Sequence, residues 1–288
     1  MSNVTPLASL TASNVVIVAG KGGVGKTTVT AVLARAAADR GRRVLVIELD
    51  GKPALADLVP DLDVRAVSAP DSLEEYLHDH GFRRIAKRLA ATGVIDVVAT
   101  AAPGIDDLVV LGKIKQLEQS GGWDLIVVDG PAAGHAITFL TAASGLLDAV
   151  RGGPVRDQAD EVLELLRDPA RCRVVLVTLP EATPVNEAIE TAFALGERVG
   201  VHLGPLVVNQ VDTTAALPEP GAIAFGSARA QVDDAIAAAA FRRTRHRLQA
   251  AEITRLAAAL PLPQVHLPIR PVAGLSPADI SALAAGLT

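Results

Sequence analysis

The sequence contains one cysteine, Cys172, one methionine and few aromatic residues: five phenylalanines, one tyrosine and one tryptophan. A single thiol excludes a disulfide within the chain. The chain also lacks an N-terminal signal sequence and any apolar run of about 18 residues, so we expect a cytoplasmic protein without a membrane-spanning helix.

The chain also lacks a large excess of charge of either sign. Acidic and basic residues are mixed along the chain, and the formal net charge is −5. This balance leaves no broad basic surface for nucleic acid or an anionic membrane. Half of the residues are hydrophobic, mostly Ala, Val and Leu, and predict a core of small aliphatic side chains. Length alone allows one large domain or two smaller ones. Because no linker interrupts the pattern, we expect one domain over residues 1–288.

Short aliphatic runs alternate with helical patterns along most of the chain. The runs predicted to be buried strands are Val15–Ala19, Val44–Leu49, Leu125–Val128, Val174–Thr178 and Leu206–Val208, with Val94–Ala99 as a further candidate. Strands that are apolar on both faces and alternate with helices are typical of a parallel sheet covered on both sides. The pattern therefore predicts a doubly wound α/β fold with a mostly parallel sheet and helices on both faces.

Other stretches fall outside this sheet. Residues 1–12 show no periodicity and are predicted to be a flexible tail. Residues 71–118 and 141–170 are predicted to contribute a small helical subdomain. Residues 213–226 are predicted to be a loop, followed by an Ala-rich helical region over 228–260 that bends at most once.

The strongest motif lies between the first predicted strand and the helix after it. It consists of Gly20, Lys21, Gly22, Gly23, Val24, Gly25, Lys26, Thr27 and Thr28. This is the P-loop pattern, in which a Gly-rich backbone presents successive N–H groups to phosphates at a helix N-terminus. Lys26 is expected to contact the β- and γ-phosphates, and Thr27 to place its hydroxyl on Mg²⁺. The motif therefore predicts that ATP and Mg²⁺ bind here.

Two carboxylates follow predicted strands at the edge where such sheets bind ligands. Asp129 comes directly after Leu125–Val128, where it can hold Mg²⁺ through water. Asp50 closes the second strand, where it can align a water molecule for attack on the γ-phosphate. The segment Gly130–His135 is expected to be a switch loop that moves when the γ-phosphate departs.

Lys21, the lysine near the start of the motif, indicates which group of ATPases the chain resembles. The sequence GKGGVGKTT over residues 20–28 resembles the deviant Walker A signature of a group of ATPases. That group includes partition ATPases, septum-site ATPases, nitrogenase iron protein, arsenite-pump ATPases and tail-anchored-protein targeting ATPases. The resemblance implies a face-to-face dimer, with an identical or a paralogous subunit, in which Lys21 contacts the partner's nucleotide.

Further segments resemble the arsenite-pump and targeting branch of that group. Residues 129–135, DGPAAGH, are similar to its switch II segment Asp-Thr-Ala-Pro-Thr-Gly-His, although the proline stands one position earlier here. Pro103–Asp107, Pro180–Glu181 and Val208–Gln210 resemble other segments of the branch, so the resemblance spans roughly residues 14–275.

The resemblance also implies roles for individual residues. Asp50 takes the place of the switch I aspartate that orients water, and Asp57 that of a second acidic position, although the family has Asp-Pro-Ala where this chain has DGKPA. Asn209 is implied to contact adenine, and Pro268 to begin a base-side loop that ends at Gly274. Without the resemblance, Asp50, Asp57 and Asn209 also fit turn positions.

One function that fits is a switch ATPase of the arsenite-pump and targeting type. It would couple ATP hydrolysis to opening and closing of a dimer, and to binding of a protein client or a membrane protein partner. One cysteine excludes a thiolate arsenite site within the chain. One methionine excludes a Met-rich groove for varied transmembrane helices, although apolar residues of Ile105–Leu117 can line a smaller groove or belong to the core.

The alternative is a partition- or septum-site-type ATPase that acts on DNA or a membrane. The cluster Arg242–Arg247 is the segment that would bind nucleic acid, but such a run is more often a solvated helix face. Residues 275–288 contain no lysine or arginine and so form no basic amphipathic helix for anionic lipid. We see no strong nucleic-acid signal.

Overall fold

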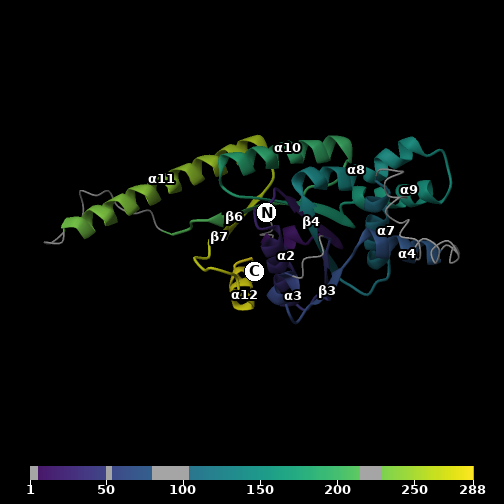
Figure 1. Ribbon diagram of the computed structural model, residues 1–288, viewed down its shortest axis with the longest axis horizontal. Helices are drawn as coiled ribbons and strands as arrows, with labels where there is room; N and C mark the ends of the chain where they lie inside the picture. Colours follow the sequence, from purple (N-terminus) through teal and green to yellow (C-terminus); the bar gives the residue numbers. More distant parts are fainter. Residues whose placement is uncertain (1–5, 50–53, 80–103, 215–228, 288) are drawn as a thin grey trace.

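The computed structural model describes residues 6–49, 54–79, 104–214 and 229–287. Within these residues, seven parallel strands form one sheet in the order β3-β2-β4-β1-β5-β6-β7 (Figure 1). The strands are β1 (Val15–Gly20), β2 (Val44–Glu48), β3 (Asp63–Ala66), β4 (Leu125–Ala132), β5 (Cys172–Thr178), β6 (Leu206–Val211) and β7 (Gln264–Pro268). The parallel α/β sheet predicted from the sequence is confirmed, with β1 at its centre between β4 and β5.

Helices cover both faces of the sheet. Within the described residues they are α1 (Pro6–Leu10), α2 (Lys26–Ala38), α3 (Ala54–Leu58), α4 (Ala69–Asp79), α7 (Ile105–Gln119), α8 (Ala133–Ala149), α9 (Pro154–Arg167), α10 (Ala182–Arg198), α11 (Arg229–Ala259) and α12 (Pro277–Ala285). The buried side chains of α1, α2, α3 and α12 form one cluster with the sheet, and those of α7 to α11 form another.

The central strand β1 shows why the sheet is apolar on both faces. Val15, Ile17 and Ala19 belong to one cluster, whereas Val16 and Val18 belong to the other. Successive side chains of a strand point to opposite faces, so a strand covered by helices on both sides needs an unbroken aliphatic run. This is the pattern from which the five confirmed strands were predicted.

The two strands missed from the sequence lie at the edges of the sheet. β3 is half-exposed, and β7 alternates between buried and more exposed residues. An edge strand has fewer neighbours to bury it, so it carries polar residues and no aliphatic run. The further candidate strand Val94–Ala99 lies outside the described residues.

Before β1, the structure has a helix where the sequence predicted a flexible tail. Pro6–Leu10 form α1, and the side chains of Leu7 and Leu10 are buried against the cluster of α2 and α12. The Leu7 N–H donates to the carbonyl oxygen of Leu287 at 3.2 Å. One helical turn is too short to show periodicity, and for this reason the sequence pattern missed it.

Several helices at one end of the sheet fall in the stretches 71–118 and 141–170 that were predicted to contribute a helical subdomain. In Figure 1, α4, α7, α8 and α9 gather at this end, and α11 extends past the opposite edge as one helix of 31 residues. Buried residues of α7, α8 and α9 belong to the same cluster as Ile17 and Val128 of the sheet. The described part of the helical region therefore shares its core with the sheet. No helix among the described residues is long and apolar enough to cross a membrane.

Candidate nucleotide site

The P-loop connects β1 to α2 at the carboxyl edge of the sheet. Gly25, directly before α2, has φ 90°, a left-handed conformation that favours glycine. A side chain at Gly25 would also collide with the amide nitrogen of Asn209. Gly22 and Gly23 are exposed. The loop therefore leaves its backbone open to a ligand at the N-terminus of α2, where N–H groups and the helix dipole favour an anion.

Lys26 and Thr27 stand in the first turn of α2, as the motif predicted. The Lys26 ammonium lies 3.4 Å from the carbonyl oxygen of Lys21, and so folds back over the loop. The Thr27 hydroxyl donates to Asp129 Oδ2 at 2.7 Å. The two residues that were predicted to hold Mg²⁺, Thr27 directly and Asp129 through water, are thus in direct contact.

Asp129 reaches this position because β4 lies beside β1 in register, with Asp129 opposite Val18. Its other oxygen, Oδ1, accepts a 3.3 Å hydrogen bond from Thr30. Burial raises the pKa of Asp129, and the Thr27 hydrogen bond and the Lys26 charge oppose that rise. A hydroxyl and one carboxylate fit Mg²⁺, which usually takes one or two protein oxygens together with phosphates and water.

Glu48 lies within the predicted strand Val44–Leu49, and the sequence indicated no role for it. It is a buried carboxylate at the last position of β2, opposite Asp129, and it accepts the Leu55 N–H at 2.9 Å. Because Glu48 ends β2 and Leu55 lies in α3, this hydrogen bond connects the strand to the helix on either side of the segment that contains Asp50. A charged residue closing an aliphatic strand was the signal that would have found it. Asp50 itself lies outside the described residues, and Asp57 is exposed in the first turn of α3.

The predicted switch loop Gly130–His135 is a strand end and a helix start. β4 continues through Ala132, and α8 begins at Ala133. Gly130 permits this, because a Cβ at that position would lie 2.5 Å from the carbonyl oxygen of Val18. The expected loop conformation is therefore wrong in this structure, since the sheet holds the segment as far as α8.

Two segments singled out in the sequence meet beside this strand end. His135 of α8 and the neighbouring Asp106 and Asp107 of α7 line a cavity of about 370 Å³, together with Pro131 and Leu49. Burial raises the pKa of Asp107, and the charge of Asp106 raises it further. The two acidic residues of one element and the histidine of the other thus share one cavity at the end of β2 and β4.

The residues implied to hold the base also come together. Asn209 and Pro268 line a cavity of about 240 Å³ with Thr28 of the P-loop and Gly274. The buried Asn209 amide donates to the carbonyl oxygen of Val24 at 2.9 Å. A carboxamide with one such bond keeps a further N–H to donate. Asn209 therefore joins the cavity to the P-loop as well as lining it.

Lys21 has a partner that the sequence did not indicate. Its ammonium lies 2.7 Å from Oε1 of Glu187 on α10. Both side chains keep about a third of their surface exposed, 38% and 35% respectively. They line an open groove of about 590 Å³ with Gly22, the last residue of β4, the start of α8 and further residues of α10.

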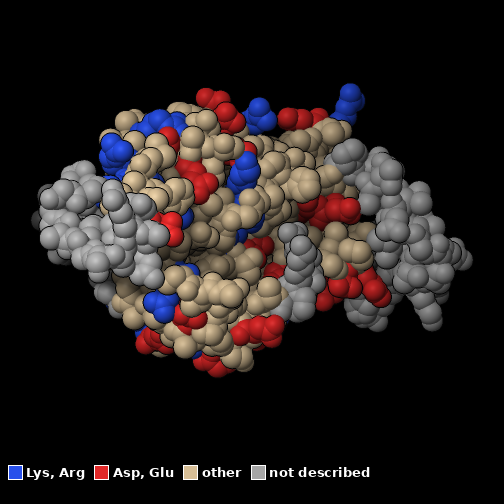
Figure 2. All heavy atoms as spheres, turned by 60° about the vertical axis from the view of Figure 1, so that its left-hand side comes forward, with Lys and Arg blue, Asp and Glu red and all other residues tan. Residues whose placement is uncertain are grey.

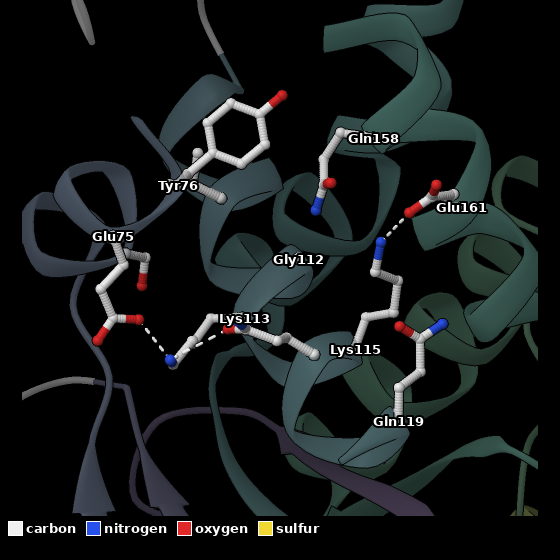
Figure 3. A pocket seen from close by; sticks show the side chains of 11 residues that line it. Glu75, Tyr76, Gly112, Lys113, Lys115, Gln119, Gln158 and Glu161 are labelled. Atoms are coloured by element: carbon white, nitrogen blue, oxygen red, sulfur yellow. Dashed lines mark hydrogen bonds and ion pairs between the residues drawn. The ribbon is translucent and has the colours of Figure 1, made fainter. Parts of the chain in front are cut away.

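A second polar pocket lies away from the P-loop, between α4, α7 and α9 (Figure 3). Lys113 pairs with Glu75 there, and the buried Lys115 pairs with Glu161. Because each ammonium already has a carboxylate, the pocket is not an unfilled anion site. Leu108, Val109, Val110, Leu111 and Ile114 of α7 are buried, so the apolar residues predicted to line a groove or to join the core have joined the core.

Comparison with known proteins agrees with this geometry. The sequence profile of the family described as "Anion-transporting ATPase" matches residues 13–151. The chain is 33% identical over 219 residues to ATPase BagA of Mycobacterium tuberculosis, an alignment that covers 67% of this chain and 64% of that protein. It is 30% identical over 222 residues to a putative arsenical pump-driving ATPase of Halobacterium salinarum, covering 66% of this chain and 34% of that protein. An arsenical pump-driving ATPase of Escherichia coli is 28% identical over 200 residues, with 67% of this chain and 34% of that protein covered. The chain thus spans less than two thirds of the length of each of these relatives.

Proposed function

Because the chain belongs to the anion-transporting ATPase family, we propose that it binds and hydrolyses Mg·ATP at the candidate nucleotide site, and that the reaction switches a dimer between open and closed states. The observation that carries the proposal is the 2.7 Å contact between Thr27 and Asp129 beside Lys26. It joins a hydroxyl, a carboxylate and an ammonium at the mouth of the P-loop, a set suited to a metal-bound triphosphate.

Each group has a distinct part in this proposal. The backbone N–H groups of residues 22–28 hold the phosphates, and Lys26 offsets the charge that develops as the γ-phosphoryl group leaves. Thr27, and Asp129 through water, hold Mg²⁺, which bridges phosphate oxygens and neutralises their charge. Asp50 orients the attacking water, and Lys21 acts on the nucleotide of the partner subunit. Asn209 and Pro268 hold the base.

The proposed target of the switch is a protein client or a membrane protein partner. Burial raises the pKa of the Cys172 thiol to about 12, which supports a chain without a thiolate site for arsenite. The pocket beside α7 is polar, so a client groove lined by the apolar residues of that helix is not part of the proposal.

The DNA- or membrane-associated alternative draws less support. Arg242 of the basic cluster pairs with Asp212 at 3.2 Å, which offsets part of its charge. Figure 2 shows basic and acidic side chains interspersed over the upper part of one face. An affinity for duplex DNA that falls steeply as the salt concentration rises would support this alternative.

The test is hydrolysis by the purified chain. With Mg·ATP we expect release of phosphate, and we expect Lys26→Ala to lower kcat/KM by about 10²–10³-fold, the loss typical of one preorganised electrostatic group. Lys113→Ala serves as the matched control, because it removes a lysine from α7 far from the P-loop. A wild-type chain without turnover, or a Lys26→Ala variant that turns over normally, would contradict the proposal.

A further inference from the structure

The ion pair between Lys21 and Glu187 joins two elements that are far apart in the sequence. Lys21 is the second residue of the P-loop motif, and Glu187 lies in the second turn of α10. The separation of 2.7 Å is that of a charge-assisted hydrogen bond, which is stronger than a neutral one. In this structure Lys21 is therefore bound to its own subunit.

The pair lies at the surface that connects the P-loop to the switch segment. The groove it lines is also lined by Gly22 and by residues 132–134, which follow Asp129 in the chain. Glu187 holds the ammonium of Lys21 toward α10. If Lys21 acts on a nucleotide in another subunit, its side chain has to leave Glu187 and swing out of the groove.

We propose that Glu187 is a positioning residue that retains Lys21 on its own subunit and so opposes closure of the dimer until ATP is bound across the interface. The inference rests on the proposed dimer switch and assigns it a regulatory contact. A ligand shifts a two-state equilibrium only by its different interactions with the two states. The Lys21–Glu187 pair forms within one subunit, and we assign it to the open state, so its loss is part of the free-energy difference that nucleotide has to overcome.

Glu187 and the phosphates of the nucleotide compete for Lys21, so the switch depends on the negative charge of the bound nucleotide. Glu187 offers one carboxylate, whereas a triphosphate offers several negatively charged oxygens. The γ-phosphate adds to the attraction that draws Lys21 across, and its release after hydrolysis lowers that attraction. Return of Lys21 to Glu187 would then favour opening.

Glu190 provides a matched control. It lies one turn further along α10 and lines the same groove. Among the residues that the structure describes, no ion pair of Glu190 is found. Glu187→Gln and Glu190→Gln therefore remove the same charge from the same helix and groove, but only the first removes the partner of Lys21.

The experiment measures the dissociation constant of the dimer by sedimentation equilibrium, with Mg²⁺ and a non-hydrolysable ATP analogue. We expect Glu187→Gln to lower this constant by about two- to fivefold, the range of ion pairs that keep contact with water. Glu190→Gln should leave it unchanged. In a Lys21→Ala background, Glu187→Gln should have no effect, because the two residues then no longer interact. Equal melting temperatures of the variants would exclude a change in folding.

The outcomes separate this inference from the function on which it rests. If the wild type dimerises with the analogue but Glu187→Gln matches Glu190→Gln, or dimerises more weakly, the retaining role of Glu187 is wrong and the dimer switch stands. If neither the wild type nor any variant dimerises, the dimer switch fails and the inference fails with it. A tighter dimer that persists in the Lys21→Ala background would also overturn it, since Glu187 would then act without Lys21.

Discussion

Asp129 illustrates how one residue can be prepared for a ligand. Burial raises its pKa, and the hydroxyl of Thr27 and the charge of Lys26 act in the opposite direction. The carboxylate is thus held by groups that also line the phosphate site. Removing the Thr27 hydroxyl would leave Asp129 Oδ2 without this hydrogen bond in a partly dehydrated place, where an unmet hydrogen bond is costly.

For Asp50 we predict that substitution separates binding from chemistry. Asp50→Asn should keep the affinity for Mg·ATP and lower kcat by about 10²–10⁴-fold, because loss of a general base affects the aligned water more than the bound complex. Nucleotide titration and single-turnover hydrolysis measure the two effects. Normal turnover would assign the water to another residue, and Glu48, the buried carboxylate that precedes this segment, would be the next candidate.

Residue contacts could be predicted from the sequence only where a motif specified both partners. Thr27 and Asp129 belong to one chemical pattern, so their proximity followed once the strands were placed side by side. Glu187 belongs to no motif and lies 166 positions from Lys21. It meets Lys21 because α10 packs near the P-loop, which is a result of tertiary packing.

At the scale of elements, α12 holds the loop beside the base cavity. Ser276 and Asp279 form a capping box at its N-terminus, and Arg270 of the loop pairs with Asp279 at 2.8 Å. Hydrogen bonds from Ser276 and Arg270 lower the pKa of Asp279 to about 2, so this carboxylate stays charged down to strongly acidic pH. The loop from Pro268 to Gly274 is therefore tied to the N-terminus of α12 through Arg270.

From this we predict a specific loss of stability. Ser276→Ala should lower the free energy of unfolding by about 1 kcal/mol, the usual cost of removing an N-cap side chain. Ser281→Ala, in the same helix, is the control, because its hydroxyl only bonds the Pro277 carbonyl oxygen on an exposed face and its loss should be nearly neutral. Urea unfolding of the two variants measures the difference, and equal midpoints would show that the cap contributes nothing.

Elements were predictable from the sequence where burial left a clear pattern. The five inner strands carry aliphatic runs because helices cover both their faces, whereas β3 and β7 are edge strands with polar residues. The course of Gly130–His135 was not predictable, since glycine and proline are typical of loops. Here Gly130 instead lets β4 approach Val18 and continue to Ala132.

At the scale of the whole molecule, the proposed dimer makes a prediction about mixed assemblies. If Lys21 acts across the interface, a dimer of one Lys21→Ala and one Asp50→Asn subunit has one site that lacks both groups and one that keeps both. About half of the wild-type rate per dimer should then return, because the intact site retains its transition-state contacts. If Lys21 instead acts within its own subunit, each site of the mixed dimer lacks one group, and no activity should return.

The measurement is the ATPase rate of purified mixed dimers carrying two different affinity tags. Homodimers of each variant, prepared in the same way, set the baseline. No recovery in verified mixed dimers would place the action of Lys21 within its own subunit, and would leave Glu187 as a contact of the P-loop without a part in assembly.

The length of α11 also has a hydrodynamic consequence. A helix of 31 residues is about 46 Å long at 1.5 Å per residue, and Figure 1 shows it extending past the edge of the sheet, with Phe241 70% exposed on it. Such an arm raises the frictional coefficient of the particle without adding much mass. A monomer should therefore elute early in gel filtration, at the position of a larger compact protein. Light scattering and sedimentation equilibrium, which report mass independently of shape, will separate a protruding arm from a second subunit.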